Sequence, residues 1–228
     1  MFVWENRRFL LLGTAVTILL TLASVGLGFL LGLPAGAIEA YGDGRLQSVV
    51  STVGVALRGT PIVVLIVLFF FGLPIPRQLG SIPVLDVRMS GFLAATLALG
   101  LRSAAYQSQV FRGTIQSVGE GQLKAARSLG LSKPAAIRHV VLPQALRRSV
   151  PGFQNEFTIV LKDTSVVFAI GLAELLRRGY QLFTQPGRQG AIIEVILAIS
   201  LIYFVLTFTT NRLLDLLDHH YAIPGGES

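Results

Sequence analysis

Residues Gly119–Pro143 read GEGQLKAARSLGLSKPAAIRHVVLP and predict a bent element made of two short helices. Strong helix formers fill residues 122–129, and the glycine that follows, Gly130, can adopt the positive φ that ends many helices. Ser132 can cap the second helix, and Pro134 is tolerated in its first turn because the amide there has no helical partner. The second helix is expected to end before the proline that closes the stretch. Such a rigid corner suits docking in a groove of a partner protein, and a lone amphipathic helix on a membrane surface is the simpler alternative.

All of the chain's net positive charge lies around this stretch. Residues 102–148 hold eight basic side chains and one acidic side chain, Glu120, so this segment carries +7 and the rest of the chain is balanced. A nucleic-acid interface would place aromatic residues among these bases, but none follows Phe111 within the segment. The charge pattern is typical of a cytoplasmic loop, and we expect no nucleic-acid partner.

The overall composition indicates that the loop connects segments buried in a lipid bilayer. The 228 residues are 52% hydrophobic and 14% charged, with a mean hydropathy of +0.67. Soluble domains have about 25% charged residues. A single soluble core could not hide so much apolar surface, whereas a bilayer could. The chain contains no cysteine, which excludes disulfides, thiolate metal sites and cysteine nucleophiles.

Apolar stretches on both sides of the loop predict an all-α integral membrane protein with about five transmembrane helices. A helix that crosses the hydrocarbon core needs about 20 mostly apolar residues. The expected spans cover residues 9–38, 49–73, 89–111, 151–176 and 191–213, and the basic loop at about 119–143 separates the third from the fourth. We expect residues 1–228 to form one transmembrane domain in the cell membrane.

The orientation of these spans depends on which basic residues dominate. A cytoplasmic basic loop combined with five spans places the N-terminus outside and the C-terminus in the cytoplasm, with Arg177 and Arg178 in an outer loop. Arg7 and Arg8, which precede the first span, favour the opposite orientation. Residues 39–45, which include a Gly-Asp-Gly sequence, are expected to form a turn.

The bent loop resembles the EAA loop of the permease subunits of ABC importers. The matching residues are Lys124-Ala125-Ala126, Gly130 and Val140-Val141-Leu142-Pro143. Other motifs resemble the polar amino acid branch of that family, which includes histidine, glutamine and arginine permeases: Arg58-Gly59-Thr60-Pro61, Ala105-Tyr106 with Phe111-Arg112-Gly113, Asn155-Glu156-Phe157 and Lys162-Asp163-Thr164-Ser165. The matches cover about residues 58–174, half of the chain, and favour the orientation with the N-terminus outside.

This resemblance implies a permease subunit that moves polar amino acids into the cytoplasm. It implies ABC ATPase subunits that hold ATP and Mg, a second permease chain of the same or a different kind, and an extracytoplasmic amino-acid-binding protein. Coupling to the ATPase is expected at Lys124, Ala125, Ala126, Gly130, Leu142 and Pro143. Three positions depart from the family pattern: Lys124 replaces a glutamate, Ala104 a glycine and Gln109 a glutamate. The first departure reverses the charge at a position expected to face the ATPase.

Charged side chains inside the predicted spans are candidates for contact with the substrate. Each costs about 2.5–3.5 kcal/mol near the middle of the bilayer unless it is paired or faces water. A carboxylate could bind the ammonium group of an amino acid and a cation its carboxylate, whereas the alternative is ion pairing that holds the helices together. The resemblance favours substrate contact for Glu156 and Lys162. Pairing between helices is the preferred interpretation of Asp163 and Arg58, and Arg102 fits both.

The sequence shows no catalytic machinery. It has no Gly-Lys pair and therefore no phosphate-binding loop, and it contains neither H-E-x-x-H nor G-x-S-x-G. Its three histidines form no recognisable metal set. We therefore expect a non-enzymatic chain without metal or cofactor of its own, energised by another subunit. The alternative function is an ion-coupled secondary transporter or channel, with Asp163 or Glu156 as its coupling group. A membrane scaffold is a third class, and it would not explain the intramembrane charges.

Overall fold

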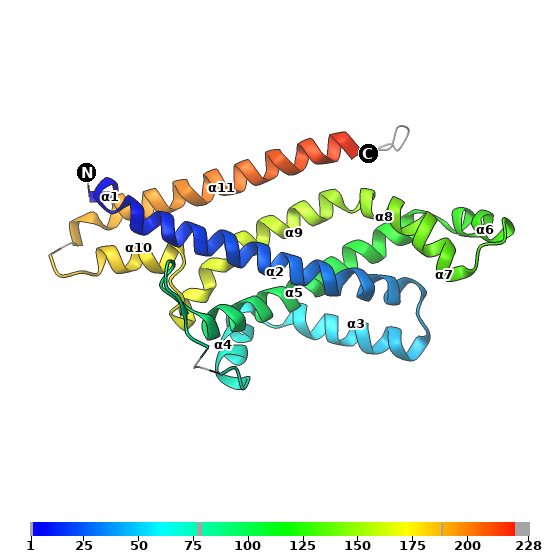
Figure 1. The fold of residues 1–228 in the computed structure, drawn as a ribbon, viewed down its shortest axis with the longest axis horizontal. Coiled ribbons are helices and arrows are strands. Elements are labelled where there is room, and N and C mark those ends of the chain that lie inside the picture. The colour runs from blue at the N-terminus through cyan, green and yellow to red at the C-terminus, as the bar shows by residue number, and fades with distance from the viewer. Residues whose placement is uncertain (1, 77–78, 188, 222–228) are drawn as a thin grey trace. The chain divides into compact units, whose positions relative to one another are not determined.

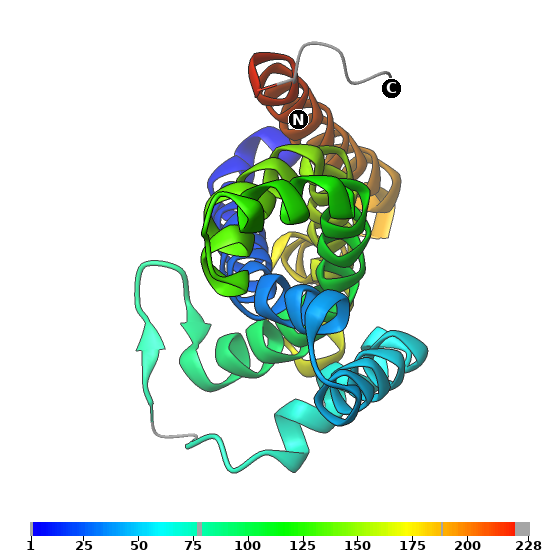
Figure 2. The same ribbon diagram turned by 90° about the vertical axis from the view of Figure 1, so that its right-hand side faces the viewer.

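The regular structure of this chain is almost entirely helical in the computed structural model, which describes residues 2–76, 79–187 and 189–221. The helices are α1 (Phe2–Glu5), α2 (Arg7–Tyr41), α3 (Gly44–Gly59), α4 (Ile62–Gly72), α5 (Met89–Ser117), α6 (Glu120–Ser128), α7 (Lys133–Ala136), α8 (Leu142–Arg148), α9 (Val150–Asp163), α10 (Leu175–Phe183) and α11 (Ile192–Tyr221) (Figure 1). The π-helical segment Ile137–Val141 joins α7 to α8. A 3-10 segment, Thr164–Ile170, follows α9, and another, Gln189–Ala191, precedes α11. The strands β1 (Ser81–Ile82) and β2 (Val87–Arg88) form an antiparallel ribbon (Figure 2).

This architecture confirms the predicted all-α membrane class. Within the described residues, α2 and residues 192–216 of α11 are each long and apolar enough to cross a membrane, and α3 with α4 qualifies as one broken span. The third and fourth expected spans correspond to α5 and α9. With 14 residues, α9 extends only about 21 Å at 1.5 Å per residue. It therefore needs the helical turns that follow it to approach the thickness of a bilayer.

The second expected span is divided at the motif that contains Gly59 and Pro61. Helix α3 ends at Gly59 and α4 begins at Ile62, so the expected span is broken between them. Pro61 has no amide hydrogen and adopts an extended conformation, with ψ at 136°. Its carbonyl accepts hydrogen bonds from the amides of Val64 and Leu65, which starts α4 in a new direction.

The fourth expected span differs from the structure at its C-terminal end. Helix α9 ends at Asp163, the 3-10 segment continues to Ile170, and Gly171 then reverses the chain at a φ of +75°. A separate helix, α10, follows where the sequence predicted the end of a span and an outer loop. Glu174 caps it, because its carboxylate accepts hydrogen bonds from the amides of Leu176 and Arg177 at 2.7 Å.

The chain divides into two compact units, each built from segments that are distant in sequence. Unit 1 comprises residues 1–27, 60–101 and 157–210, and unit 2 comprises residues 28–59, 102–156 and 211–228. Because the boundaries fall inside α2, α5, α9 and α11, each of these helices contributes to both units.

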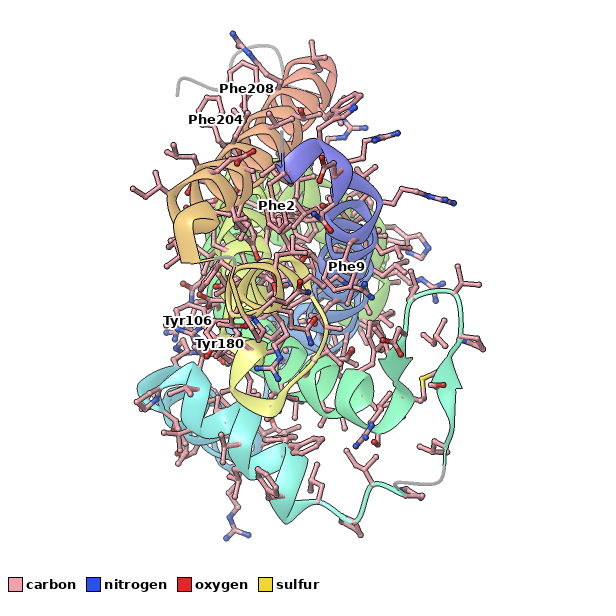
Figure 3. The ribbon with its side chains drawn as sticks, turned by 90° about the vertical axis from the view of Figure 1, so that its left-hand side faces the viewer. Phe2, Phe9, Tyr106, Tyr180, Phe204 and Phe208 are labelled. Atoms are coloured by element: carbon pink, nitrogen blue, oxygen red, sulfur yellow. The ribbon has the colours of Figure 1, made fainter. Side chains whose placement is uncertain are left out.

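One hydrophobic cluster of unit 1 lies where α10 packs against the beginnings of α2 and α11. Its buried members are aliphatic: Leu10, Leu175, Leu182, Val195 and Ile199. Figure 3 shows Phe204 and Phe208, both exposed, projecting from α11. Exposed apolar residues along α11 suit contact with lipid.

A buried arginine also holds unit 1 together. The guanidinium of Arg178 lies over the ring of Phe9 and donates hydrogen bonds to the carbonyls of Ala173 and Leu85. Leu85 belongs to the turn between β1 and β2, so Arg178 attaches this turn to α10. The sequence predicted an outer loop at Arg178, whereas the structure has helix α10 there with the Arg178 side chain buried. The carbonyl groups and the aromatic face replace the water that would otherwise solvate the cation.

Unit 2 brings the second half of α2 into close contact with α5. Three glycines spaced by four residues, Gly28, Gly32 and Gly36, face α5. A Cβ atom at Gly32 would lie 2.9 Å from the carbonyl oxygen of Ala104, and one at Gly36 would lie 2.7 Å from that of Ser108. Small residues permit such close approach of membrane helices, which are held together by packing and polar contacts rather than by exclusion from water.

Candidate functional site

The bent element predicted between the third and fourth spans is present in unit 2. Helix α6 ends at Ser128, and Gly130 adopts a φ of +89° at the corner. The amide of Gly130 donates to the carbonyl of Arg127, and the amide of Leu131 donates to that of Ala126. The hydroxyl of Ser132 then accepts a hydrogen bond from the amide of Ala135 and caps α7. The predicted helix, glycine corner and second helix are therefore all observed.

The end of this element differs from the prediction. The second helix was expected to stop before Pro143, but α7 continues through the π-helical segment into α8 and ends at Arg148. Pro143 lies in the first turn of α8, where it is tolerated. A proline inside a regular α-helix would clash with the carbonyl four residues before it. The wider π turn of residues 137–141 lies at this point and allows the helix to continue.

A small hydrophobic core supports the bent element at the adjoining ends of α2 and α5. It contains Ile115, Val118, Val141 and Ala145, and Leu142 packs against it. Among the residues matched to the EAA loop, Ala126 is buried and Leu142 is half-buried, whereas Lys124, Ala125, Gly130 and Pro143 are exposed. The first two stabilise the bend, and the other four are accessible to a partner.

Lys124, which replaces the glutamate of the family pattern, forms an ion pair within its own helix. The ammonium of Lys124 lies 2.9 Å from the carboxylate of Glu120, one turn earlier, and both side chains are about four-fifths exposed (77% and 83%). The hydrogen bond from Lys124, assisted by its charge, keeps the pKa of the Glu120 carboxyl below its usual value. Exposed pairs of this kind contribute little to stability because water screens both charges. Lys124 can therefore exchange Glu120 for a partner's group at little cost.

The predicted substrate residues on α9 have contrasting environments. Glu156 belongs to unit 2 and is buried, with 5% of its surface exposed. Lys162 and Asp163 belong to unit 1, where Lys162 is exposed and Asp163 is half-buried. A lysine exposed within an expected span fits a water-filled path better than a packed core. The substrate-binding roles of these three residues remain predictions.

The two predicted arginines of unit 2 are both half-buried and have defined contacts. Nη1 of Arg58 donates a hydrogen bond to the carbonyl oxygen of Ala105 in α5, 2.5 Å away. The guanidinium of Arg102 lies over the ring of Tyr106, 5.3 Å from its centroid. The contact of Arg58 favours the interpretation that it holds helices together.

Glu39 lies at the start of the segment, residues 39–45, that was predicted from the sequence to be a turn, and it was not among the predicted site residues. Helix α2 continues to Tyr41, and Glu39 is buried inside unit 2. Its carboxylate accepts hydrogen bonds from Gln109 at 2.6 Å and Ser108 at 3.3 Å, and it lies 3.6 Å from the guanidinium of Arg112. Its backbone carbonyl accepts a hydrogen bond from the amide group of Gln47 in α3. The expected span ended at residue 38, one residue before Glu39, and α2 continues for about one more turn.

Comparisons with known proteins identify the fold and the family. The family model for binding-protein-dependent transport system inner membrane components matches residues 24–222. The glutamine transport system permease protein GlnP of Escherichia coli strain K12 is 31% identical over 221 residues, covering 97% of this chain and 96% of that protein. The octopine transport system permease protein OccQ of Rhizobium radiobacter is 32% identical over 212 residues, covering 91% and 87%.

A solved structure agrees with this assignment. The crystal structure of an amino acid ABC transporter with histidines superposes with a TM-score of 0.79 at 31% identity, and the match covers 95% of both chains. The chain therefore belongs to the family of inner membrane components of binding-protein-dependent transport systems, and it is a multi-pass membrane permease subunit.

Proposed function

We propose that this permease subunit translocates polar amino acids into the cytoplasm as part of an ABC importer. The observation that carries the proposal is the exposed corner at Gly130, built on a buried core, in a chain similar to a glutamine permease over 97% of its length. A rigid exposed bend can transmit the movement of a partner protein to the helices that support it.

The energy for transport comes from a separate ATPase subunit that holds ATP and Mg. The bent element offers this partner an exposed surface and a groove of about 550 Å³, lined by residues that include Tyr41, Ile137 and Leu142. Lys133 and Arg138 also line the groove, so a partner with acidic residues would complement it. This surface lies in the cytoplasm, which places the N-terminus outside and the C-terminus inside.

A second permease chain, of the same or a different kind, completes the translocation path. One chain of this family contributes about five expected spans, too few to enclose a gated path alone, and pairing across a two-fold axis is the usual solution. An extracytoplasmic binding protein delivers the amino acid. The family description, which names a binding-protein-dependent system, supports the presence of such a partner. Glu156 and Lys162 contact the amino acid as it crosses.

Uptake by the reconstituted complex tests the proposal. The chain is co-expressed with its genomic neighbours, extracted in mild detergent and reconstituted into liposomes. Uptake of radiolabelled L-glutamine, L-arginine and L-histidine is then measured with and without ATP. We expect a nucleotide-binding subunit to co-purify in equal amount with the permease and uptake to require ATP. Uptake that follows an ion gradient without ATP would instead identify a secondary transporter.

A further inference from the structure

A polar pocket of about 280 Å³ lies in unit 2 next to the buried carboxylate of Glu39. One face of α3 lines it with Gln47, Ser48, Ser51 and Thr52, together with Glu39 of α2 and Arg112 of α5. Gly44 completes a lining that has no apolar side chain. Drug-sized ligands occupy pockets of about 300–1,000 Å³, so this volume suits a smaller and strongly polar molecule.

The pocket belongs to a polar stripe along α3. Residues 44, 47, 48, 51 and 52 recur at the spacing that places side chains on one face of a helix. Continued for two turns beyond Ser51, the same row reaches Arg58, which binds the carbonyl of Ala105 in α5. Arg112 lies two turns after Ala105 in α5. Arg58 therefore lies on the same face of α3 as the pocket, two turns beyond it and separated from it by Gly54 and Val55.

The two charges in the pocket match the two ends of an amino acid. Glu39 and Arg112 lie 3.6 Å apart, longer than a close ion pair, and the Arg112 side chain is 39% exposed. Gln109 and Ser108 hold the Glu39 carboxylate independently of Arg112. The guanidinium can therefore turn towards a ligand carboxylate. This turn would uncover the carboxylate of Glu39, whose side chain is 1% exposed, for an ammonium group.

The pocket also adjoins the bent element. Arg112 is three residues before Ile115, which packs with Val118 and Val141 in the core under the bend. Ala40 and Tyr41, directly after Glu39, pack against the same core. Under the proposed orientation, this is the cytoplasmic end of the permease. A molecule in the pocket would lie where transported substrate leaves the membrane.

We propose that this pocket is an exit-side binding site for zwitterionic amino acids, with Arg112 binding the carboxylate and Glu39 the ammonium group. The hydroxyl and amide groups of α3 solvate the polar side chain of the ligand. The site is distinct from the predicted contacts on α9, and its assignment to the exit side rests on the proposed function.

The absence of cysteine from the chain allows a direct test. Ser51→Cys is introduced, the complex with its ATPase is placed in nanodiscs without nucleotide, and modification by a membrane-impermeant methanethiosulfonate reagent is timed. We expect L-glutamine or L-arginine at 10 mM to slow the reaction several-fold. The amide of L-arginine, which lacks the carboxylate, and N-acetyl-L-glutamine, which lacks the ammonium group, should give no protection. Ser81→Cys in β1, which is exposed, serves as the control and should react at the same rate with every additive.

The outcomes separate the pocket from the overall function. Equal modification of Ser51→Cys with and without the amino acids, in a complex that performs ATP-driven uptake, overturns the pocket and leaves the proposed function standing. Protection in a complex whose uptake does not require ATP supports the pocket and rejects the ABC mechanism. Equal protection by both analogues rejects zwitterion recognition. Loss of protection in Arg112→Gln, with protection retained in Arg112→Lys, assigns the carboxylate contact.

Discussion

The guanidinium of Arg58, on the last turn of α3, donates a hydrogen bond to the carbonyl oxygen of Ala105 in the middle of α5. The donor precedes the break at Pro61, so it holds the end of α3 against α5 where the chain changes direction. A charged donor on a main-chain acceptor stabilises a structure by about 1.5–3 kcal/mol. This contact supports the structural role of Arg58.

Replacing Arg58 should therefore damage stability before substrate recognition. We expect Arg58→Gln to lower the thermal unfolding midpoint of the purified complex while its affinity for amino acid stays within about twofold of the wild type. Differential scanning fluorimetry and binding of radiolabelled substrate measure the two quantities. Arg88→Gln, at an exposed position in β2, is the matched control and should leave both unchanged. Lost affinity with an unchanged midpoint would return Arg58 to the substrate site.

The corner of the bent element should tolerate no β-branched residue at Gly130. Its φ of +89° is strained for any side chain, and most of all for valine. We expect Gly130→Val to reduce ATPase co-purification or ATP-driven uptake at least tenfold, with normal insertion in the membrane. Gly121→Ala is the control, because Gly121 lies in α6 with open space around it and no positive φ. Normal uptake by Gly130→Val would show that the corner transmits nothing.

Reversing the charge of Lys124 should weaken assembly with the native ATPase. Lys124→Glu would place two carboxylates one turn apart on α6, beside Glu120, and would repel an acidic partner. We expect less ATPase to co-purify, and the loss should shrink at high salt because the side chains are exposed. Glu120→Gln is the control, because it keeps the positive charge of Lys124 and removes only the negative charge of its ion-pair partner. Tighter association of Lys124→Glu would mean that the partner presents a base at this position.

The charged residues of α9 should act on substrate rather than on assembly. Removing one partner of a desolvated charged contact costs about 2–5 kcal/mol, or roughly 30-fold to several-thousand-fold in affinity. Glu156→Gln and Lys162→Met should abolish substrate-stimulated transport while the dimer and its ATPases remain assembled. Size-exclusion chromatography and equilibrium binding on the solubilised complex separate these properties. Wild-type affinity in a well-assembled Lys162→Met complex would remove Lys162 from the site.

Larger side chains at the glycines of α2 should destabilise the protein most at the positions that lie closest to α5. A side chain at Gly32 would meet the backbone of Ala104 at 2.9 Å, whereas one at Gly26 would meet nothing within 4 Å. Overpacking of this kind costs about 1–3 kcal/mol. We expect Gly32→Val to lower the membrane abundance and the unfolding midpoint of the protein and Gly26→Ala to be neutral, as judged by immunoblotting and fluorimetry. Equal tolerance at both positions would disprove close packing.

Local signals were sufficient where the backbone follows from neighbouring residues. The corner at Gly130 and the cap at Ser132 were predicted because glycine, serine and proline restrict the conformation of the residues beside them. Pro61 lacks an amide hydrogen, so a break or a kink in the second expected span is the local expectation, and the structure has a break there. Pro143 was misjudged because the π-helical segment that accommodates it leaves no mark on the sequence.

Residues whose burial depends on distant segments could not be placed from the sequence. Glu39 looks like part of a polar turn until Ser108, Gln109 and Arg112 surround it, about 70 residues later in the chain. Arg178 likewise finds the carbonyl of Leu85 only through the fold. Sequence periodicity identifies which side chains share a face, but the partners of a buried charge are a property of the packed molecule.

The division of the second span has a consequence for the biosynthesis of this protein. With 11 residues, α4 extends about 16 Å, roughly half of the hydrocarbon thickness, so it cannot be recognised as a complete membrane segment when it leaves the ribosome. In unit 1 it contacts the 3-10 segment Thr164–Ile170, which is translated about 100 residues later. A nascent chain that ends before Thr164 lacks this contact surface. The second span therefore reaches its final arrangement only after most of the chain has been synthesised.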